Sequence, residues 1–79
     1  MTMLDIQPSA TLRRQDVVAM NTNMILSNSG LMKKDLAKAM GLSPQSMASR
    51  LQSKADWTID ETCAAADFFG VPLMALLDE

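Results

Sequence analysis

Residues 31–51 read LMKKDLAKAMGLSPQSMASRL, and two short amphipathic segments meet there at Gly41. The second segment opens with Ser43 and Pro44, a helix-start signal. Serine at the N-cap accepts a hydrogen bond from a free backbone N–H, and proline suits the first helical position. Glycine at the end of the first segment supplies backbone that a side chain would strain. Two helices joined by such a short turn form a helix-turn-helix, which this pattern predicts.

The first predicted helix of this motif covers residues 33–40, and the second covers residues 44–52. Each has an apolar face with the period of a helix. The side chains expected to point inward are Leu36, Ala37, Met40, Met47 and Leu51. Those expected on or near the outer face of the second helix are Gln45, Ser46, Ser49, Arg50 and Gln52. A polar outer face suits base edges in a DNA major groove, where glutamine pairs with adenine, but any surface helix also has one.

A longer helix is predicted before the motif, starting at Thr11 or Leu12 and running to Ser29. Apolar residues recur there at three- and four-residue spacings, which places them on one face. These residues are Val17, Met20, Met24 and Ile25. The residues expected to face away are Asn21, Thr22 and Asn23. Because those three are poor helix formers, tertiary packing has to stabilise this helix.

Two shorter helices are predicted after the motif. Thr58 and Glu61 form a capping box that opens a helix ending at Gly70. The inward side chains of that helix are expected to be Ile59, Cys63, Ala66 and Phe69. Pro72 begins a fifth helix, and its apolar side is expected to consist of Leu73, Leu76 and Leu77. Trp57 precedes the capping box, and we interpret it as a hydrophobic anchor rather than as a base-stacking residue.

Length and composition fit one small all-α domain. The chain has 79 residues, of which 48% are hydrophobic, and a disordered chain would contain fewer. No apolar run reaches the ~20 residues of a transmembrane helix. The N-terminus lacks the basic head and apolar middle of a secretory signal. We therefore expect a cytoplasmic protein with an N-terminal arm over residues 1–12, either loose or pairing with a second subunit, and a helical domain over residues 13–79.

Charge is distributed unevenly along the chain. The net charge is −2, yet seven basic and two acidic residues between positions 13 and 54 give that span a local charge of +5. The remaining seven acidic residues lie outside it. Phosphate binding needs a local positive surface rather than a positive protein, so a nucleic-acid partner fits this pattern. A solvated basic face without a partner fits it equally well.

Side chains for enzymatic chemistry are scarce, so we expect no enzyme. The chain has no histidine, which removes histidine-based catalytic pairs and the usual metal clusters. Its one cysteine, Cys63, has no internal partner for a disulfide and lies in the apolar run CAAA, where small buried cysteines are common. No metal, cofactor or small-molecule substrate is expected.

The residues LMKKDLAKAMGLS, positions 31–43, resemble the Cro/C1-type (XRE) helix-turn-helix family, whose members typically read LTQEELAExLGVS. The likeness continues over residues 44–51, resumes with WTIDE at 57–61 and closes with ADFFGVP at 66–72. It spans about residues 13–77. The resemblance implies a five-helix fold of the lambda-repressor type, a homodimer at least on DNA, and a palindromic operator.

The resemblance also implies how the motif would dock. The second helix of the motif lies in the major groove with its N-terminal residues on base edges. By position, the base-reading residues are Pro44, Gln45 and Ser49. The residues that fall at phosphate-contacting positions are Lys33, Ser46 and Gln52. On the basis of positive charge alone, we add Arg50 to the candidate base-reading residues. On the same basis, Lys34 and Lys54 are added to the candidate phosphate contacts.

Four positions depart from the family pattern. Met32 replaces the usual threonine or serine cap, so the first helix of the motif starts without a side-chain acceptor. Lys33 stands where glutamine is common, which favours a phosphate contact. Pro44 offers bases only an apolar ring. Arg50 stands where an apolar residue is frequent, so the inward contact is expected to shift to Leu51.

Two functions are therefore compared. The first is a sequence-specific DNA-binding transcription regulator, a Cro- or repressor-like protein of a bacteriophage that acts in the bacterial host. The second is a protein-interaction module, such as an antitoxin or adaptor with the same fold, which the acidic total and the apolar run VPLMALL at 71–77 favour. Dimer contacts are expected either from that run or from residues 1–6.

Overall fold

A computed structural model describes residues 13–78 of the chain. The described residues form an all-α domain, as the sequence predicts, and none of them lies in a strand. Its five helices are α2 (Arg14–Ser29), α3 (Lys33–Met40), α4 (Pro44–Leu51), α5 (Ile59–Phe69) and α6 (Met74–Leu77). The expected arm over residues 1–12 lies outside the described residues. The helix start expected at Thr11 or Leu12 is wrong, because Arg13 has extended backbone as the N-cap and α2 begins at Arg14.

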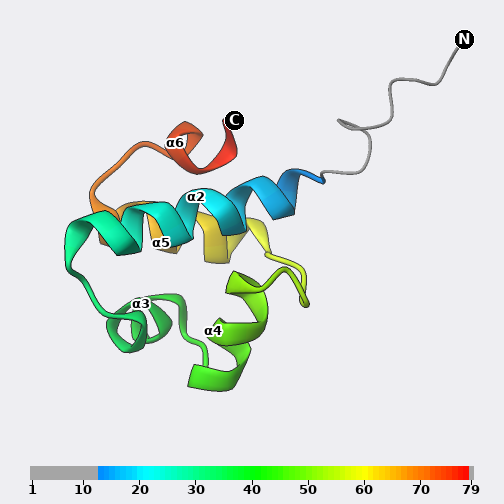
Figure 1. The fold of residues 1–79 in the computed structure, drawn as a ribbon, viewed down its shortest axis with the longest axis vertical. Helices are drawn as coiled ribbons and strands as arrows, with labels where there is room; N and C mark the ends of the chain where they lie inside the picture. Colours follow the sequence, from blue (N-terminus) through cyan, green and yellow to red (C-terminus); the bar gives the residue numbers. More distant parts are fainter. Residues whose placement is uncertain (1–12, 79) are drawn as a thin grey trace, which may run out of the picture.

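Helix α2 is the longest element, and the other helices are arranged around it (Figure 1). It packs against α6 on one side and against α4 on the other, and it also contacts α5. Helix α3 packs on α5 and α4. The short α6, which closes the chain, therefore returns to the helix that opens the domain.

Several helix ends follow the capping signals of the sequence, although α6 begins at Met74 rather than at the predicted Pro72. Ser43 caps α4, and its hydroxyl oxygen accepts a hydrogen bond from the Ser46 N–H at 3.1 Å. Thr58 and Glu61 form the predicted capping box at the start of α5. Helix α3 begins after Met32 without a side-chain cap, as expected. These contacts join residues three apart in the chain, which is why a local sequence pattern predicts them.

The core lies where α2, α3, α4, α5 and α6 meet. The predicted inward residues of the helix-turn-helix are confirmed, since all five are buried. They are Leu36, Ala37, Met40, Met47 and Leu51. Leu76 of α6 is fully buried in the same cluster, and Trp57, Leu42 and Phe69 pack against it while half-buried.

The predicted inner face of α2 is wrong in part. Met20 and Met24 are 55% and 58% exposed, whereas Thr22 is fully buried. The buried row runs through Val18, Thr22 and Leu26, which are four residues apart and so share one face. The apolar spacing of the two methionines is also helical, but their row faces solvent because no other helix covers it.

The asparagines of α2 do not simply face away either. Asn21 is half-buried, and its side-chain N–H groups donate to the carbonyl oxygens of Leu76 at 2.9 Å and Asp78 at 2.7 Å. Asn23, also half-buried, donates to the Leu51 carbonyl at 2.9 Å. Both amides therefore satisfy carbonyls at the C-terminal ends of α6 and α4, groups that a helix leaves without internal partners.

The inner face predicted for α5 also needs correction. Ile59 is 77% exposed, and Cys63 is half-buried rather than buried. The prediction for Ala66 is confirmed, since Ala66 is buried, and the other buried residues of α5 are Thr62 and Ala65. Ile59 is the first residue of α5, and at the end of a helix the helical spacing of apolar residues does not by itself bury a side chain.

Candidate nucleic-acid interface

The turn between α3 and α4 places α4 on the surface of the domain. Gly41 ends α3 in the left-handed conformation with a φ of 71°, and the Leu42 N–H donates to the Ala37 carbonyl at 2.8 Å. Met47 of α4 is 1% exposed and Leu36 of α3 is fully buried. These apolar contacts leave the side of α4 that carries Pro44 and Gln45 facing outward, and α4 lies beside α3 (Figure 1).

The outward side of α4 carries hydrogen-bonding groups at its N-terminal end. Pro44 and Gln45 are exposed, and within residues 13–78 the Gln45 amide has no hydrogen-bond partner. Ser49 is half-buried one turn further along. Ser46 is half-buried, and the Ser43 hydroxyl donates to its hydroxyl oxygen at 3.1 Å. Gln45 is thus the polar side chain of this face that is best placed to reach a ligand.

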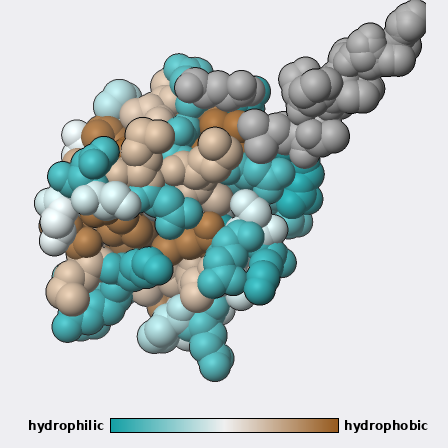
Figure 2. All heavy atoms as spheres, viewed as in Figure 1, coloured by the Kyte–Doolittle hydropathy of each residue, from teal (hydrophilic) through white to brown (hydrophobic). Residues whose placement is uncertain are grey.

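Four exposed lysines lie on the segments that precede and follow α4. Lys33, Lys34 and Lys38 are exposed on α3, and Lys54 is exposed on the loop that follows α4. None of the four forms an ion pair with another residue of the part that the structure describes. Gln52, at the C-cap of α4, is exposed as well. Figure 2 shows hydrophilic residues gathered at the edge where α3 and α4 lie.

The arginines, in contrast, make contacts within the domain. Arg13 lies 3.5 Å from the Asp16 carboxylate and 3.9 Å from that of Asp56. Arg14 donates to the Leu77 carbonyl at 2.7 Å. The basic residues thus divide by type: the lysines extend into solvent, and the arginines bridge helices or cap them.

Arg50 forms the most enclosed of these contacts. Its guanidinium donates from Nε and Nη2 to the two carboxylate oxygens of Glu61 at 3.1 Å and 3.0 Å. Burial raises the pKa of Glu61, but the hydrogen bonds from Arg50 and from the Thr58 N–H outweigh it and hold that pKa below its ordinary value. The guanidinium is therefore engaged before any ligand arrives.

The predicted site residues lie on α3, on α4 and in the segment that follows α4, and they differ in exposure. The exposed ones are Pro44, Gln45, Gln52, Lys33, Lys34 and Lys54. The half-buried ones are Ser46, Ser49 and Arg50. The sequence reasoning did not identify Glu61 as the partner of Arg50. The two residues are 11 positions apart on different helices, and the sequence holds no local signal for that contact.

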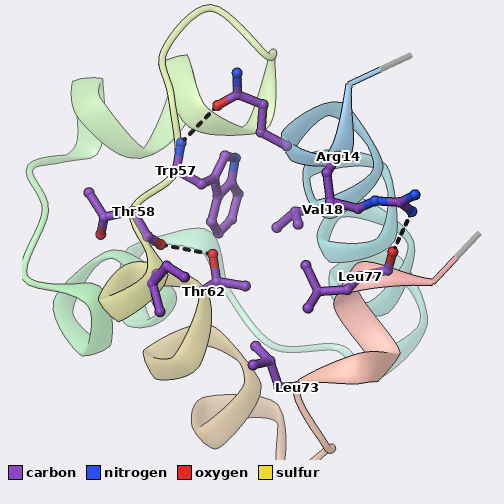
Figure 3. Close-up of a pocket in the computed structure, with 9 residues that line it drawn as sticks. Arg14, Val18, Trp57, Thr58, Thr62, Leu73 and Leu77 are labelled. Carbon is purple, nitrogen blue, oxygen red and sulfur yellow. Dashed lines mark hydrogen bonds between the residues drawn. The ribbon is translucent and has the colours of Figure 1, made fainter. Parts of the chain in front are cut away.

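A second surface feature lies on another part of the domain. An open cavity of about 250 Å³ is bounded by α2, α6 and the start of α5. Its apolar lining includes Val18, Trp57 and Leu77, whose side chains point toward a common space in Figure 3. Ile59 and Leu73, 77% and 36% exposed, also line it. A small apolar side chain from a partner protein would fit such a cavity.

Other classes of site find no support in the described residues. Within residues 13–78, no three metal-binding side chains come together. No helix in that range has both the length and the apolar character needed to cross a membrane. Comparisons with protein-family models, with curated proteins and with solved structures found no match.

Proposed function

We propose that this protein is a sequence-specific DNA-binding transcription regulator of the Cro/C1-type helix-turn-helix family, acting in the cytoplasm of a bacterial host as a phage Cro or repressor does. One observation supports the proposal above all. The helix that follows a glycine turn presents an exposed Gln45 amide, and four exposed lysines lie on α3 before that helix and on the loop after it. Within residues 13–78 the amide has no hydrogen-bond partner and the lysines form no ion pairs. Hydrogen-bonding groups flanked by positive charge match a base edge flanked by phosphates.

In the proposed complex α4 enters the major groove of double-stranded DNA. Gln45 pairs with an adenine, Ser49 donates or accepts at a neighbouring base, and the Pro44 ring contacts a thymine methyl group. Backbone phosphates are contacted by residues on both sides of the groove, namely Lys33, Lys34, Ser46, Gln52 and Lys54. The phosphate contacts set the register, and the base contacts select the sequence.

The protein is proposed to bind its operator as a homodimer. One copy of α4 is eight residues long and reaches few bases, which limits affinity and specificity. Two copies related by a two-fold axis would read two half-sites about 34 Å apart, one turn of DNA. The operator is therefore expected to be palindromic.

The test starts with selection of bound sequences from random double-stranded DNA, followed by fluorescence anisotropy on the selected site at several salt concentrations. We expect affinity to fall steeply with salt because lysine–phosphate contacts release counterions. Gln45→Ala combined with Ser49→Ala should abolish the preference for the selected site. Asn28→Ala, which removes an exposed amide from α2, serves as the control. A flat salt response, or full specificity in the double variant, would refute the proposal.

Lysine variants distinguish phosphate contacts, which position the protein on DNA, from base contacts, which select the sequence. Lys33→Ala should weaken binding to all sequences by a similar factor and reduce the salt slope by about one contact, because a lysine on phosphate carries no sequence information. A loss confined to one base-pair variant of the operator would show instead that Lys33 contacts a base.

A protein-interaction module is the second candidate, and the apolar cavity favours it. Ile59 and Leu73 expose apolar surface beside that cavity, and the chain carries a net charge of −2. Purification of a stoichiometric complex with another protein, combined with no measurable DNA affinity, would support this function. In that case Ile59→Ser should dissociate the complex, whereas Gln45→Ala should leave it intact.

A further inference from the structure

The contact between Arg50 and Glu61 joins the last turn of α4 to the first turn of α5. The two side chains are 18% and 12% exposed, so solvent screens their contact less than a surface pair. Glu61 Oε1 also accepts from the Thr58 N–H at 3.1 Å as part of the capping box. One carboxylate thus fixes the start of α5 and, through the planar two-point fork of arginine, the end of α4.

Trp57 extends this network to the rest of the domain. Its indole Nε1–H donates to the Arg50 carbonyl at 3.1 Å. Its backbone N–H donates to Gln15 Oε1 on α2 at 3.3 Å (Figure 3). Hydrogen bonds therefore fix both the backbone and the side chain of Arg50, and the network joins α2, α4 and α5.

We infer that Arg50 is a positioning residue, which sets the orientation of α4 through Glu61, and that sequence specificity depends on this bridge. The inference rests on the proposed DNA-binding function. Gln45 lies five residues before Arg50, about 7.5 Å along the helix axis. A rotation of α4 released at Arg50 would move the Gln45 amide away from the base edge, although Arg50 itself touches no base.

Direct DNA contact by Arg50 through Nε or Nη2 would have to break this bridge. A guanidinium that turned toward phosphate would leave the Glu61 carboxylate, 12% exposed, without its main partner. An enclosed charge that loses its partner is costly. The lysines on α3 and the Lys54 side chain already supply cations without any such loss.

The experiment uses the full chain and compares Arg50→Gln, Glu61→Gln, the double variant and Arg50→Lys. The probes are the selected DNA site and a shuffled sequence, measured by anisotropy at several salt concentrations. The two single substitutions change the net charge by one unit in opposite directions. A purely electrostatic role predicts opposite shifts in affinity, whereas a positioning role predicts that both variants lose specificity.

We expect Arg50→Gln and Glu61→Gln each to lower the ratio of specific to non-specific affinity by about tenfold, the scale of coupling between contacting residues. The double variant should lose no more than either single variant. Arg50→Lys should lose nearly as much specificity, because lysine keeps the charge but lacks the planar two-point donor geometry of arginine. The salt slope should stay that of the unmodified protein in all of them.

Lys54→Gln is the matched control, since it removes an exposed cation without an ion pair. It should weaken binding to both DNAs and reduce the salt slope by about 0.9, the value for one phosphate contact. Circular dichroism confirms that each variant is folded at the assay temperature. If Arg50→Gln does not fold, Glu61→Gln and Arg50→Lys carry the comparison, because neither leaves the enclosed Glu61 carboxylate without a cation beside it.

Three results would overturn the inference while the unmodified protein still binds its site. A reduced salt slope in Arg50→Gln would show a phosphate contact. Specificity relaxed at one base pair alone would show a base contact. Unchanged specificity in Glu61→Gln would show that the bridge is not needed. Failure of the proposed function looks different, because the unmodified chain itself would then show no salt-dependent DNA binding, and the role of Arg50 would fall with it.

Discussion

The Thr22 hydroxyl is buried without a hydrogen-bond partner, so we expect Thr22→Val to stabilise the protein. The side chain is fully buried on the inner face of α2, and among the described residues its Oγ1 has no hydrogen-bond partner. Valine has nearly the shape of threonine, with a methyl group in place of the hydroxyl. The exchange removes an unmet polar group and leaves the packing around it unchanged.

The size of the effect follows from the terms that change. A buried hydroxyl without a partner costs about 1–3 kcal/mol, and mutational data on such groups lie near the lower end. Valine and threonine have similar helix propensities, so the backbone contributes little. We expect the free energy of unfolding to rise by about 1 kcal/mol. For a domain of this size that corresponds to a rise of roughly 4–8 °C in Tm.

Urea unfolding followed by circular dichroism and by Trp57 fluorescence measures this change. Thr62→Val is the matched control on α5. Thr62 is 6% exposed, and its hydroxyl donates to the Thr58 carbonyl at 2.9 Å. The same exchange there removes a hydrogen bond that is made, so it should bring no gain. A loss of stability in Thr22→Val, or equal effects of the two substitutions, would refute the reasoning.

Three further expectations concern pH, the turn and the surface. The pKa of Glu61 in the folded protein lies below its ordinary value of 4.5, so the carboxylate stabilises the fold above pH 4.5 and this contribution is lost as the pH falls through the folded pKa. Glu61→Gln should therefore make acid unfolding below pH 4.5 less steep when it is followed by circular dichroism. Gly41→Ala should lower the free energy of unfolding by about 1 kcal/mol in urea titration, because φ is 71° there, and Gly41→Asn should lose less. Met24→Gln should change the free energy of unfolding by less than about 0.5 kcal/mol, since Met24 is 58% exposed. A larger loss of stability in urea titration would place Met24 in the core.

Helix boundaries in this protein were predictable because their signals are local. Ser43 and Pro44 start α4, and the Thr58–Glu61 capping box starts α5, through contacts that span at most three residues. Gly41 and Gly70 end helices because both take the left-handed conformation, which glycine adopts without strain. Each of these contacts is complete within one short segment.

Burial on α2 was less predictable, since it depends on which neighbours cover which row of side chains. Met20 and Thr22 show the difficulty. The apolar methionine is 55% exposed, and the polar threonine is fully buried. From hydrophobicity alone, Met20 would be expected to be the more buried of the two. The packing of α4, α5 and α6 against α2 reverses this order of burial, because only the covered row of side chains is removed from water.

The candidate site shows the same division. Exposure of Lys33, Lys34 and Gln45 could be predicted, because lysine and glutamine side chains are mostly exposed unless a partner holds them inside the protein. The state of Arg50 could not be, because its partner Glu61 belongs to a different helix and is reached only through the loop that contains Trp57.

The amino-acid sequence by itself determined the helical class, the order of the helices and the caps that open α4 and α5, because these depend on residues three or four apart. Tertiary structure alone decided which face of α2 is buried and which cations remain available for a ligand. Those outcomes depend on contacts between distant segments, such as Asn21 with the end of α6 and Arg50 with Glu61. A side chain acquires such a partner only when separate helices pack together.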